Sequence, residues 1–440
     1  MIASKAESEF PVVVSPDTDP RRFWRVARLI HKIAFVGDSI TDSTSGYPNQ
    51  GAPVGMPSYM HRSYSGYAAA ILGQAFTPTT NSYSFLGPTL PDWDFGWGGI
   101  RADGYLTATV NSRSSGGNQY PGVTLTPAQV AIASNPDAYV VLIGTNDIPS
   151  ASATVVTDRI AAVLDVLRAT GKLVFCGTLL PRLGDTAAPT VEPMQTRIDA
   201  VNAALPAICE ERDVTLVSWH EALMTGNQQN PVYFPDGVHP NSGGSSVMGA
   251  ILAAALRPYM ASEFPLPPKG DSRWASSNPY MDVDSDGNGR ADGFSFSYFT
   301  SNAFSLETAD GEVWQRCVEP PETIQKNDAR IIYTPSVAPA RRDALSESQI
   351  SLRVACRYEI LSADVGAIGL LVKCQSGGEV NLYTGYYRPA NYDGPLVPHQ
   401  GLMITGKFVI PSGTTQLSIS LVNYGGVDLR IRQFGVFEDP

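Results

Sequence analysis

The chain has 440 residues, which is more than one hydrophobic core usually accommodates, so two domains are expected. Its hydrophobic content of 43%, charged content of 17%, 40 Gly and 34 Pro favour a loop-rich, β-containing protein over a helical bundle. The formal net charge of −11 excludes the basic surface of a nucleic-acid-binding protein.

The sequence also bears on the compartment in which the protein acts. No apolar run is long enough to span a membrane, and no membrane partner is expected. The start MIASKAESEFPVVVSPDTDP lacks the apolar core of a signal peptide, so either export uses another route or a leader was removed before this numbering. We expect a protein that acts outside the cell, secreted or carried on a virion. The 5 cysteines are too few and too scattered for a disulfide framework or a zinc site, and Cys356 and Cys374 are either a disulfide pair or two buried thiols.

Residues 1–31 form an N-terminal segment that precedes the first regular pattern. Its stretch RRFWRVARLIHK interleaves arginines with apolar residues. Such a stretch is either a membrane-surface or attachment segment, or a helix or strand that packs on the following domain. We favour the second interpretation, because a single short stretch is weak support for the first.

Residues 32–261 alternate short apolar runs with helical periodicity, which predicts an α/β domain with a parallel sheet and helices on both faces. The predicted strands are 33–36, 138–143, 173–176 and 214–217. The predicted helices are 63–75, one that begins near Thr126 with Pro127 at its first position, 151–170, 191–212 and 243–260. Ligands of such sheets bind beyond the C-terminal strand ends, and Ser39 and Asn146 each follow a predicted strand.

The second half of the chain has a different pattern. Residues 262–274 are Pro-rich and polar, which predicts a linker. Over 275–440 the helical periodicity is gone and short alternating runs predict an antiparallel β-sandwich. The predicted strands there are 294–299, 350–360, 368–374, 408–410 and 417–422.

Four short motifs follow one another in the α/β half. They read GDSIT (37–41), GG (98–99), GTND (144–147) and DGVHP (236–240). Each motif alone is also common as an ordinary turn or helix cap. Together they supply a serine nucleophile, oxyanion donors and an acid–base pair, which is a complete set of parts for acyl transfer.

The motifs assign a role to each of five residues. A serine hydroxyl becomes a good nucleophile when a base removes its proton, which makes Ser39 the candidate nucleophile and His239 the candidate base. Asp236 would accept the imidazole Nδ1–H and fix the tautomer. The backbone N–H groups of Ser39 and Gly99 and the side-chain amide of Asn146 would stabilise the oxyanion.

With these residues in view, 33–260 resembles the SGNH or GDSL hydrolase family. GDSIT resembles the first family block, GWGGIRADGYL the second, IGTND the third and DGVHPN the fifth, and the second-block glycine corresponds best to Gly99. The resemblance implies a flavodoxin-like three-layer α/β/α fold. It also implies hydrolysis of an ester through an acyl-serine, with no cofactor for catalysis.

The substrate is predicted less directly. The stretch GKFVIPSGTTQLSISLVNYGGVDLRIRQFGVF resembles the last strands of jelly-roll carbohydrate-binding modules, and Trp93 and Trp97 flank the second motif, where they either stack on sugars or belong to the core. We therefore expect an esterase that removes acetyl groups from a polysaccharide or other glycan. The alternatives are a lipase or thioesterase of the same family and a glycan-binding deacetylase of a phage tail or virion. The oligomeric state stays open.

The second half also holds a candidate calcium loop, DVDSDGNGRADG (282–293). Carboxylates at its positions 1, 3 and 5 and a glycine at 6 resemble the first half of an EF-hand loop. The candidate ligands are Asp282, Asp284, Asp286, Asn288 and Asp292. Position 12 is Gly293 where an EF-hand has a bidentate glutamate, so we expect a weaker or differently closed structural site, the alternative being an acidic surface turn.

Overall fold

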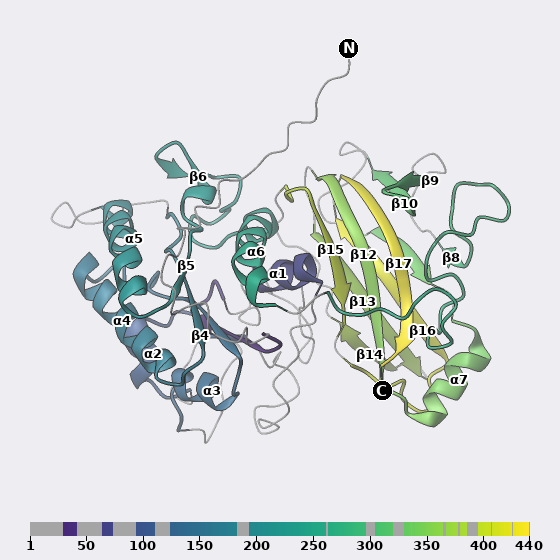
Figure 1. The fold of residues 1–440 in the computed structure, drawn as a ribbon, viewed down its shortest axis with the longest axis horizontal. Helices are drawn as coiled ribbons and strands as arrows, with labels where there is room; N and C mark the ends of the chain where they lie inside the picture. The colour runs from purple at the N-terminus through teal and green to yellow at the C-terminus, as the bar shows by residue number, and fades with distance from the viewer. Residues whose placement is uncertain are drawn as a thin grey trace, which may run out of the picture.

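The structure, a computed structural model, describes residues 30–41, 64–73, 94–110, 124–182, 193–260, 263–295, 304–319, 330–335, 337–363, 367–376, 379–384, 395–405, 407–424 and 426–439. These residues form an α/β domain and a domain of antiparallel sheets, which lie side by side (Figure 1). Most of the predicted N-terminal segment lies outside the described residues, and Ile30 near its end pairs with Met260 in an isolated bridge. In the described part of the chain, no helix combines the length and the apolar character needed to cross a bilayer.

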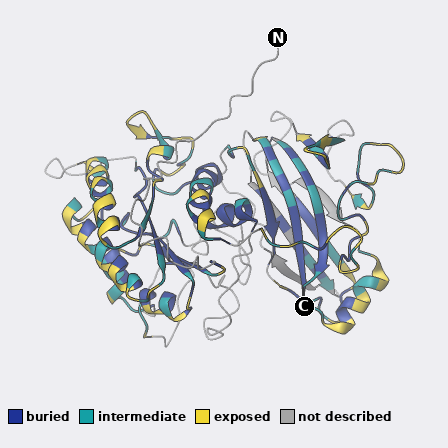
Figure 2. Cartoon of the chain, viewed as in Figure 1, coloured by how far each residue is buried: buried dark blue, intermediate teal, exposed yellow. Residues whose placement is uncertain are grey.

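The sheet of the α/β domain has the strand order β2-β1-β3-β4-β5, and all of its neighbouring strands are parallel, as predicted. The strands are β1 (Ile33–Gly37), β2 (Asp94–Gly96), β3 (Ala138–Leu142), β4 (Leu173–Gly177) and β5 (Thr215–Val217). Every residue of β1 and β3 is buried, as expected of parallel strands that are covered on both faces (Figure 2). The three-residue strand β2 was too short for the sequence pattern to reveal.

Helices cover both faces of this sheet and create two cores. They are α1 (Tyr64–Leu72), α2 (Ala102–Thr107), α3 (Pro127–Ala133), α4 (Ala153–Arg168), α5 (Met194–Glu211) and α6 (Ser242–Leu256). Val36 and Val141 share one core with residues of α2 to α5, whereas Phe35 and Val140 share the other with α1 and α6 (Figure 1). Neighbouring strand residues thus enter opposite cores, which fixes the register of the sheet.

Local sequence signals begin several of these helices. Thr126 and Gln129 form a capping box at the start of α3, with Pro127 at the first helical position as predicted. Ser152 caps α4 by accepting a hydrogen bond from the Val155 N–H, and Asn241 caps α6 in the same way from Gly244. The cap of α6 lies directly after the fourth motif and so anchors that loop.

The second domain is built from two antiparallel sheets with orders β15-β12-β17-β10-β9 and β14-β13-β16-β11-β8. The strands are β8 (Phe294–Ser295), β9 (Phe304–Ala309), β10 (Glu312–Glu319), β11 (Arg330–Pro335), β12 (Leu352–Ala363), β13 (Ala367–Ser376), β14 (Glu379–Thr384), β15 (His399–Ile404), β16 (Gln416–Tyr424) and β17 (Val427–Glu438). Side chains of both sheets share one core, which makes the domain a β-sandwich.

Two features of the sandwich differ from the sequence prediction. The predicted strand 408–410 is wrong, because Phe408 makes only an isolated bridge with Leu352. A helix, α7 (Pro339–Ser348), was not expected in the β-rich half; it is mostly exposed, so an apolar stripe does not mark it in the sequence. The five cysteines are all free and buried, so Cys356 and Cys374 are two thiols.

The two domains meet through α1. Tyr67 and Ala70 on this helix belong to the core of the sandwich, and the ring of Tyr67 lies edge-on to His399 of β15 at 6.0 Å. A Cβ on Gly401 would lie 2.7 Å from the Ala70 carbonyl oxygen, so only glycine lets β15 approach the helix this closely. From α6, the Ser246 hydroxyl accepts a hydrogen bond from the Val397 N–H at 3.2 Å.

The segment predicted as a linker packs along the sandwich from Glu263 onward. Phe264 donates its N–H to the Gly73 carbonyl at the end of α1 (2.8 Å). Trp274 stacks edge-on with Phe437 of β17, with ring centroids 5.3 Å apart. This segment therefore ties the domains together instead of acting as a free spacer.

Candidate active site

The turn after β1 presents Ser39 at the C-terminal edge of the parallel sheet. A Cβ on Gly37 would collide with the Leu142 carbonyl oxygen and the Thr41 hydroxyl, so the first motif needs glycine where β1 passes β3. Asp38 shapes the turn, because its Oδ1 accepts the Ile40 N–H at 3.0 Å and its carbonyl accepts the Thr41 N–H at 3.1 Å.

The structure brings the predicted nucleophile, base and acid together. Ser39 Oγ lies 2.8 Å from His239 Nε2, although the two residues are 200 positions apart. His239 Nδ1 lies 2.7 Å from Asp236 Oδ2, and Asp236 Oδ1 accepts the backbone N–H groups of Val238 (2.9 Å) and His239 (2.7 Å). Because Nδ1–H is donated to Asp236, Nε2 is left to accept the serine proton.

The carboxylate of Asp236 is held in its ionised form. Its partial burial disfavours the charge, but the hydrogen bonds from the His239 side chain and from the backbone of His239 and Val238 outweigh that penalty. The net effect lowers the pKa of Asp236 from 3.8 to about 2. An ionised Asp236 can therefore stabilise an imidazolium at His239 over the whole neutral range.

The loop that carries Asp236 and His239 is fixed by Gln229, a residue that the sequence analysis missed. Gln229, in the short hairpin β6 (Met224–Thr225) and β7 (Gln228–Gln229), donates its side-chain amide to the carbonyls of Pro181 (2.7 Å) and Gly237 (3.0 Å). Gly237 has a φ of 77°, which favours glycine in this turn. The amide thus joins the loop after β4 to the histidine loop.

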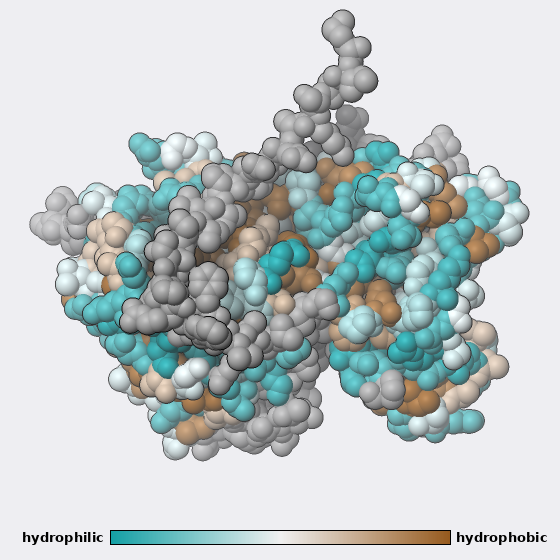
Figure 3. Space-filling view, viewed as in Figure 1, coloured by the Kyte–Doolittle hydropathy of each residue, from teal (hydrophilic) through white to brown (hydrophobic). Residues whose placement is uncertain are grey.

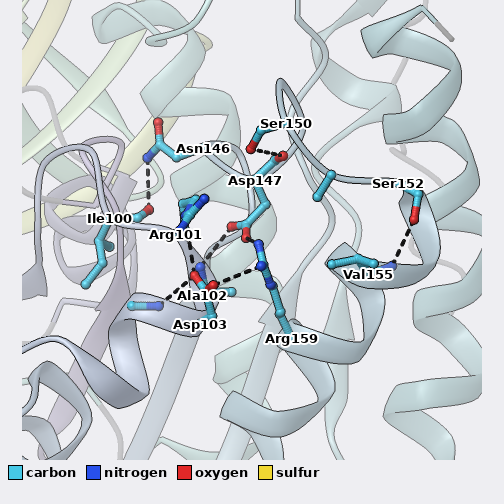
Figure 4. A network of polar contacts seen from close by, with 12 residues as sticks. Ile100, Arg101, Ala102, Asp103, Asn146, Asp147, Ser150, Ser152, Val155 and Arg159 are labelled. Carbon is cyan, nitrogen blue, oxygen red and sulfur yellow. Dashed lines mark hydrogen bonds and ion pairs between the residues drawn. The ribbon is translucent and has the colours of Figure 1, made fainter. Parts of the chain in front are cut away.

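The predicted oxyanion donors follow the next two strands. Gly99 lies in the turn after β2 with a φ of 70°, which favours glycine, and a Cβ there would meet no atom of the described residues within 4 Å. Asn146 follows β3, and its Nδ2 donates to the Ile100 carbonyl at 3.0 Å (Figure 4). An amide nitrogen carries two N–H groups, so Asn146 keeps one for an oxyanion while the other ties it to the second motif.

Comparison with known proteins agrees with this geometry. Residues 35–247 match the model of the GDSL-like Lipase/Acylhydrolase family. They form a GDSL hydrolase domain. No curated protein matches the chain.

The chain is also similar to several solved structures. A putative acylhydrolase from Bacteroides fragilis is 19% identical over 52% of this chain and 87% of its own, with a TM-score of 0.34. A carbohydrate esterase family 3 protein from Talaromyces cellulolyticus is 20% identical over 52% and 96%, with a TM-score of 0.32. An acetylxylan esterase mutant from Geobacillus stearothermophilus is 17% identical over 54% and 97%, with a TM-score of 0.35. We draw nothing about the substrate from likenesses of this size.

Trp97, one of the two aromatic residues considered for contact with a sugar, lies in the core of the GDSL domain. Trp97 is only 3% exposed, and its ring packs in the core beside Phe95 and Tyr105 at 6.5 and 6.0 Å. Its ring faces are therefore not available for stacking, so of the two alternatives for Trp97 the structure agrees with the core one. Trp93 lies outside the described residues.

Two charged groups beside the site were not identified from the sequence. Asp38 is fully buried, its Oδ2 has no hydrogen-bond partner among the residues that the structure describes, and burial raises its pKa from 3.8 to about 6 against the opposing effects of the Ile40 N–H, His239 and Arg182. Arg182 follows the end of β4 and donates to the Thr145 carbonyl at 3.1 Å. Burial lowers the pKa of Arg182, while Asp38 and Asp236 act in the opposite direction, so the guanidinium is the counter-charge of both carboxylates. The sequence offered one signal for Arg182, its position shortly after the end of a predicted strand.

In the sandwich, part of the predicted calcium loop converges. Ligand oxygens of Asp284, Asp286 and Asp292 lie within 4.8 Å of one another. Asp282 is not part of this group and pairs with Lys269. Asn288 donates its amide to Asp286 at 2.8 Å and stays a candidate ligand through its side-chain oxygen. Three carboxylates form an all-oxygen donor set of the kind that a hard cation such as Ca²⁺ prefers.

Proposed function

We propose that the protein is a serine esterase in which Ser39 attacks the acyl carbonyl of an ester. The observation that carries the proposal is the continuous chain from Ser39 Oγ through His239 to Asp236, with contacts of 2.8 and 2.7 Å. These distances are in the range of strong hydrogen bonds, which a nucleophile–base–acid relay requires.

The reaction follows from these positions. His239 Nε2 takes the proton of Ser39 as its Oγ adds to the carbonyl carbon, and Asp236 stabilises the imidazolium that results. The N–H groups of Ser39 and Gly99 and the amide of Asn146 stabilise the negative oxygen of the tetrahedral intermediate. His239 then returns the proton to the departing alcohol, which leaves an acyl-serine. Water, deprotonated by the same imidazole, adds to this ester and releases the acid and free Ser39.

We further propose that the acyl group is acetyl and that the alcohol belongs to a polysaccharide. A lipid substrate usually meets an enzyme across an exposed apolar surface. The exposed large hydrophobic side chains of the described residues are isolated valines at positions 155, 166, 232, 283 and 318. The face drawn in Figure 3 is correspondingly mixed, with hydrophobic residues in separate patches among hydrophilic ones. Both observations favour a polar substrate.

The proposal is tested by Ser39→Ala with 4-nitrophenyl acetate as substrate. We expect kcat/KM to fall by roughly 10⁴-fold or more, with an unchanged circular dichroism spectrum. The matched control is Ser362→Ala on β12, an exposed serine in the other domain, which should retain full activity. Full turnover by Ser39→Ala would overturn the mechanism. A series from acetyl to octanoyl esters, followed by acetate release from acetylated polysaccharides, tests the substrate, and a strong preference for octanoyl would favour a lipase or thioesterase instead.

A further inference from the structure

The proposed chemistry gives no role to Asp147, the last residue of the third motif. Asp147 is completely buried, and both of its carboxylate oxygens are engaged. Oδ2 accepts the Ala102 N–H at the start of α2 (2.8 Å), and Oδ1 accepts Nη1 of Arg159 from α4 (2.7 Å; Figure 4). Asp147 thus connects the loop after β3 to two other elements.

Arg159 extends this connection to a second carboxylate. Its Nη2 lies 2.9 Å from Asp103 Oδ2, in the first turn of α2, and Asp103 Oδ1 also lies 3.4 Å from Arg101 Nε (Figure 4). The guanidinium therefore bridges Asp147 and Asp103 with two different nitrogens. A planar fork of fixed geometry can hold both acids at once, whereas a lysine ammonium would act as a single point charge.

These contacts surround the two predicted oxyanion donors. Gly99 lies three positions before Ala102, and Asn146 is the neighbour of Asp147. Two bonds join the segments directly: Asn146 donates to the Ile100 carbonyl, and Asp147 accepts the Ala102 N–H. Arg159 adds an indirect link, because it contacts both Asp147 and Asp103. The Gly99 turn is also held by Trp97, whose N–H donates to the Gly37 carbonyl (3.0 Å) and whose carbonyl accepts the Ile100 N–H (3.1 Å). The bonds from Asn146 and Asp147 add to this support, because they fix the distance between the Gly99 turn and the loop after β3.

We propose that Arg159 is a positioning residue that sets the spacing between the Gly99 N–H and the Asn146 amide. The inference rests on the proposed function, because it concerns the oxyanion hole of that reaction. Donors of an oxyanion hole act on the tetrahedral state, so a change in their spacing lowers kcat while KM stays nearly constant. Removal of the guanidinium also leaves the Asp147 carboxylate buried without its counter-charge and removes the link to Asp103, so the Ala102 N–H alone would tie Asp147 to α2.

The test compares Arg159→Gln with Arg168→Gln on the same helix. Arg168 also forms an ion pair, with Asp213 at 3.0 Å, and its side chain is 21% exposed against 25% for Arg159, but it lies at the other end of α4. We expect about a tenfold or larger loss of kcat for Arg159→Gln, a KM within about threefold of the wild type, and no change for Arg168→Gln. The affinity for a small boronic acid, which forms a tetrahedral adduct with a serine, should fall in parallel with kcat.

A second variant keeps the inference testable if Arg159→Gln does not fold. Asp103→Asn removes the outer ion pairs of Asp103 with Arg159 and Arg101 and leaves Asp147 bonded to Arg159. We expect a smaller loss of kcat, again with unchanged KM, and Arg159→Lys should recover activity only in part. Wild-type kcat and boronic acid affinity in both folded variants would overturn the inference. If Ser39→Ala keeps its activity, the proposed function fails as well; if Ser39→Ala is inactive and the Arg159 and Asp103 variants are normal, only the inference fails.

Discussion

Asp236 holds His239 at two points, with Oδ2 at 2.7 Å from the ring Nδ1 and Oδ1 at 2.7 Å from the backbone nitrogen. The spacing of three residues across Gly237 makes both bonds possible within one turn. The same carboxylate therefore shapes the loop and selects the tautomer of the base. This double role explains why a short DGVH sequence suffices to place an acid–base pair.

Asp236→Asn should separate these two roles. The amide oxygen can still accept a backbone N–H, but an amide NH₂ facing Nδ1 would favour the wrong tautomer, and kcat should fall on the order of 10⁴-fold. The measurement is kcat on an acetyl ester, with the thermal midpoint as a control for folding. Because the pKa of Asp236 is about 2, its protonation should not limit activity between about pH 4 and pH 8. A modest loss of activity would mean that Asp236 shapes only the loop.

Asp38 predicts a pH dependence of stability. Its pKa is raised by burial from 3.8 to about 6, so below pH 3.8 the folded and unfolded states are both protonated and the residue has no effect. As the pH rises from 3.8 to 6 the unfolded state ionises first, and the folded state loses roughly 3 kcal/mol, a loss that is complete above pH 6. Asp38→Asn keeps an oxygen for the Ile40 N–H but cannot ionise.

The free energy of unfolding should be measured in urea at pH 4, 5, 6 and 7 for the wild type and for Asp38→Asn. We expect the variant to gain stability relative to the wild type as the pH rises, by about 3 kcal/mol over the series. A difference between the two proteins that stays constant with pH would contradict the burial argument.

Much of the α/β domain could be predicted because its signals are local. The runs 33–36 and 138–143 are buried strands, and the Thr126–Pro127 pair begins a helix, so periodicity and caps were sufficient. Ser39, Asn146 and His239 each belong to a short local motif, and the parallel sheet brings the ends of its strands together.

The residues that the sequence did not reveal act over long distances. Arg159 reaches Asp147 from another helix, and Gln229 joins the loops of Pro181 and Gly237, yet neither residue belongs to a motif. The two alternatives for Trp97 stayed open for a related reason, since only the fold decides whether an aromatic ring beside a motif faces the site or the core. Sequence patterns therefore predicted the chemical groups but not the residues that hold them in place.

His399 at the junction of the domains predicts a second pH effect. Its Nδ1–H donates to the Val397 carbonyl at 2.7 Å and its Nε2 accepts the Tyr358 hydroxyl at 2.9 Å, so the ring is neutral in this arrangement. Burial lowers its pKa below the ordinary value of 6.5, against the smaller opposing effect of the Val397 carbonyl. The unfolded state therefore takes up a proton first, and stability should fall as the pH drops below about 6.5.

Thermal midpoints at pH 7.5, 6.5 and 5.5 test this effect. We expect the wild type to lose stability toward pH 5.5 more steeply than His399→Gln, which has no group to protonate and can retain a hydrogen bond to Tyr358. If the thermal midpoints of the two proteins fall equally with pH, protonation of His399 does not destabilise the contact between α1 and β15.

The acidic loop of the sandwich makes the last prediction, which concerns metal binding. We expect Ca²⁺ to bind Asp284, Asp286 and Asp292, which converge to within 4.8 Å, with a dissociation constant on the order of 10⁻⁴–10⁻³ M because a bidentate glutamate is missing at Gly293. Millimolar Ca²⁺ should then raise the thermal midpoint by mass action, and excess EDTA should reverse the rise. Asp286→Asn should abolish the response, while Asp310→Asn, in the exposed β9–β10 turn, should keep it. Equal midpoints with Ca²⁺ and with EDTA, together with no heat of binding in calorimetry, would identify the loop as an acidic surface turn.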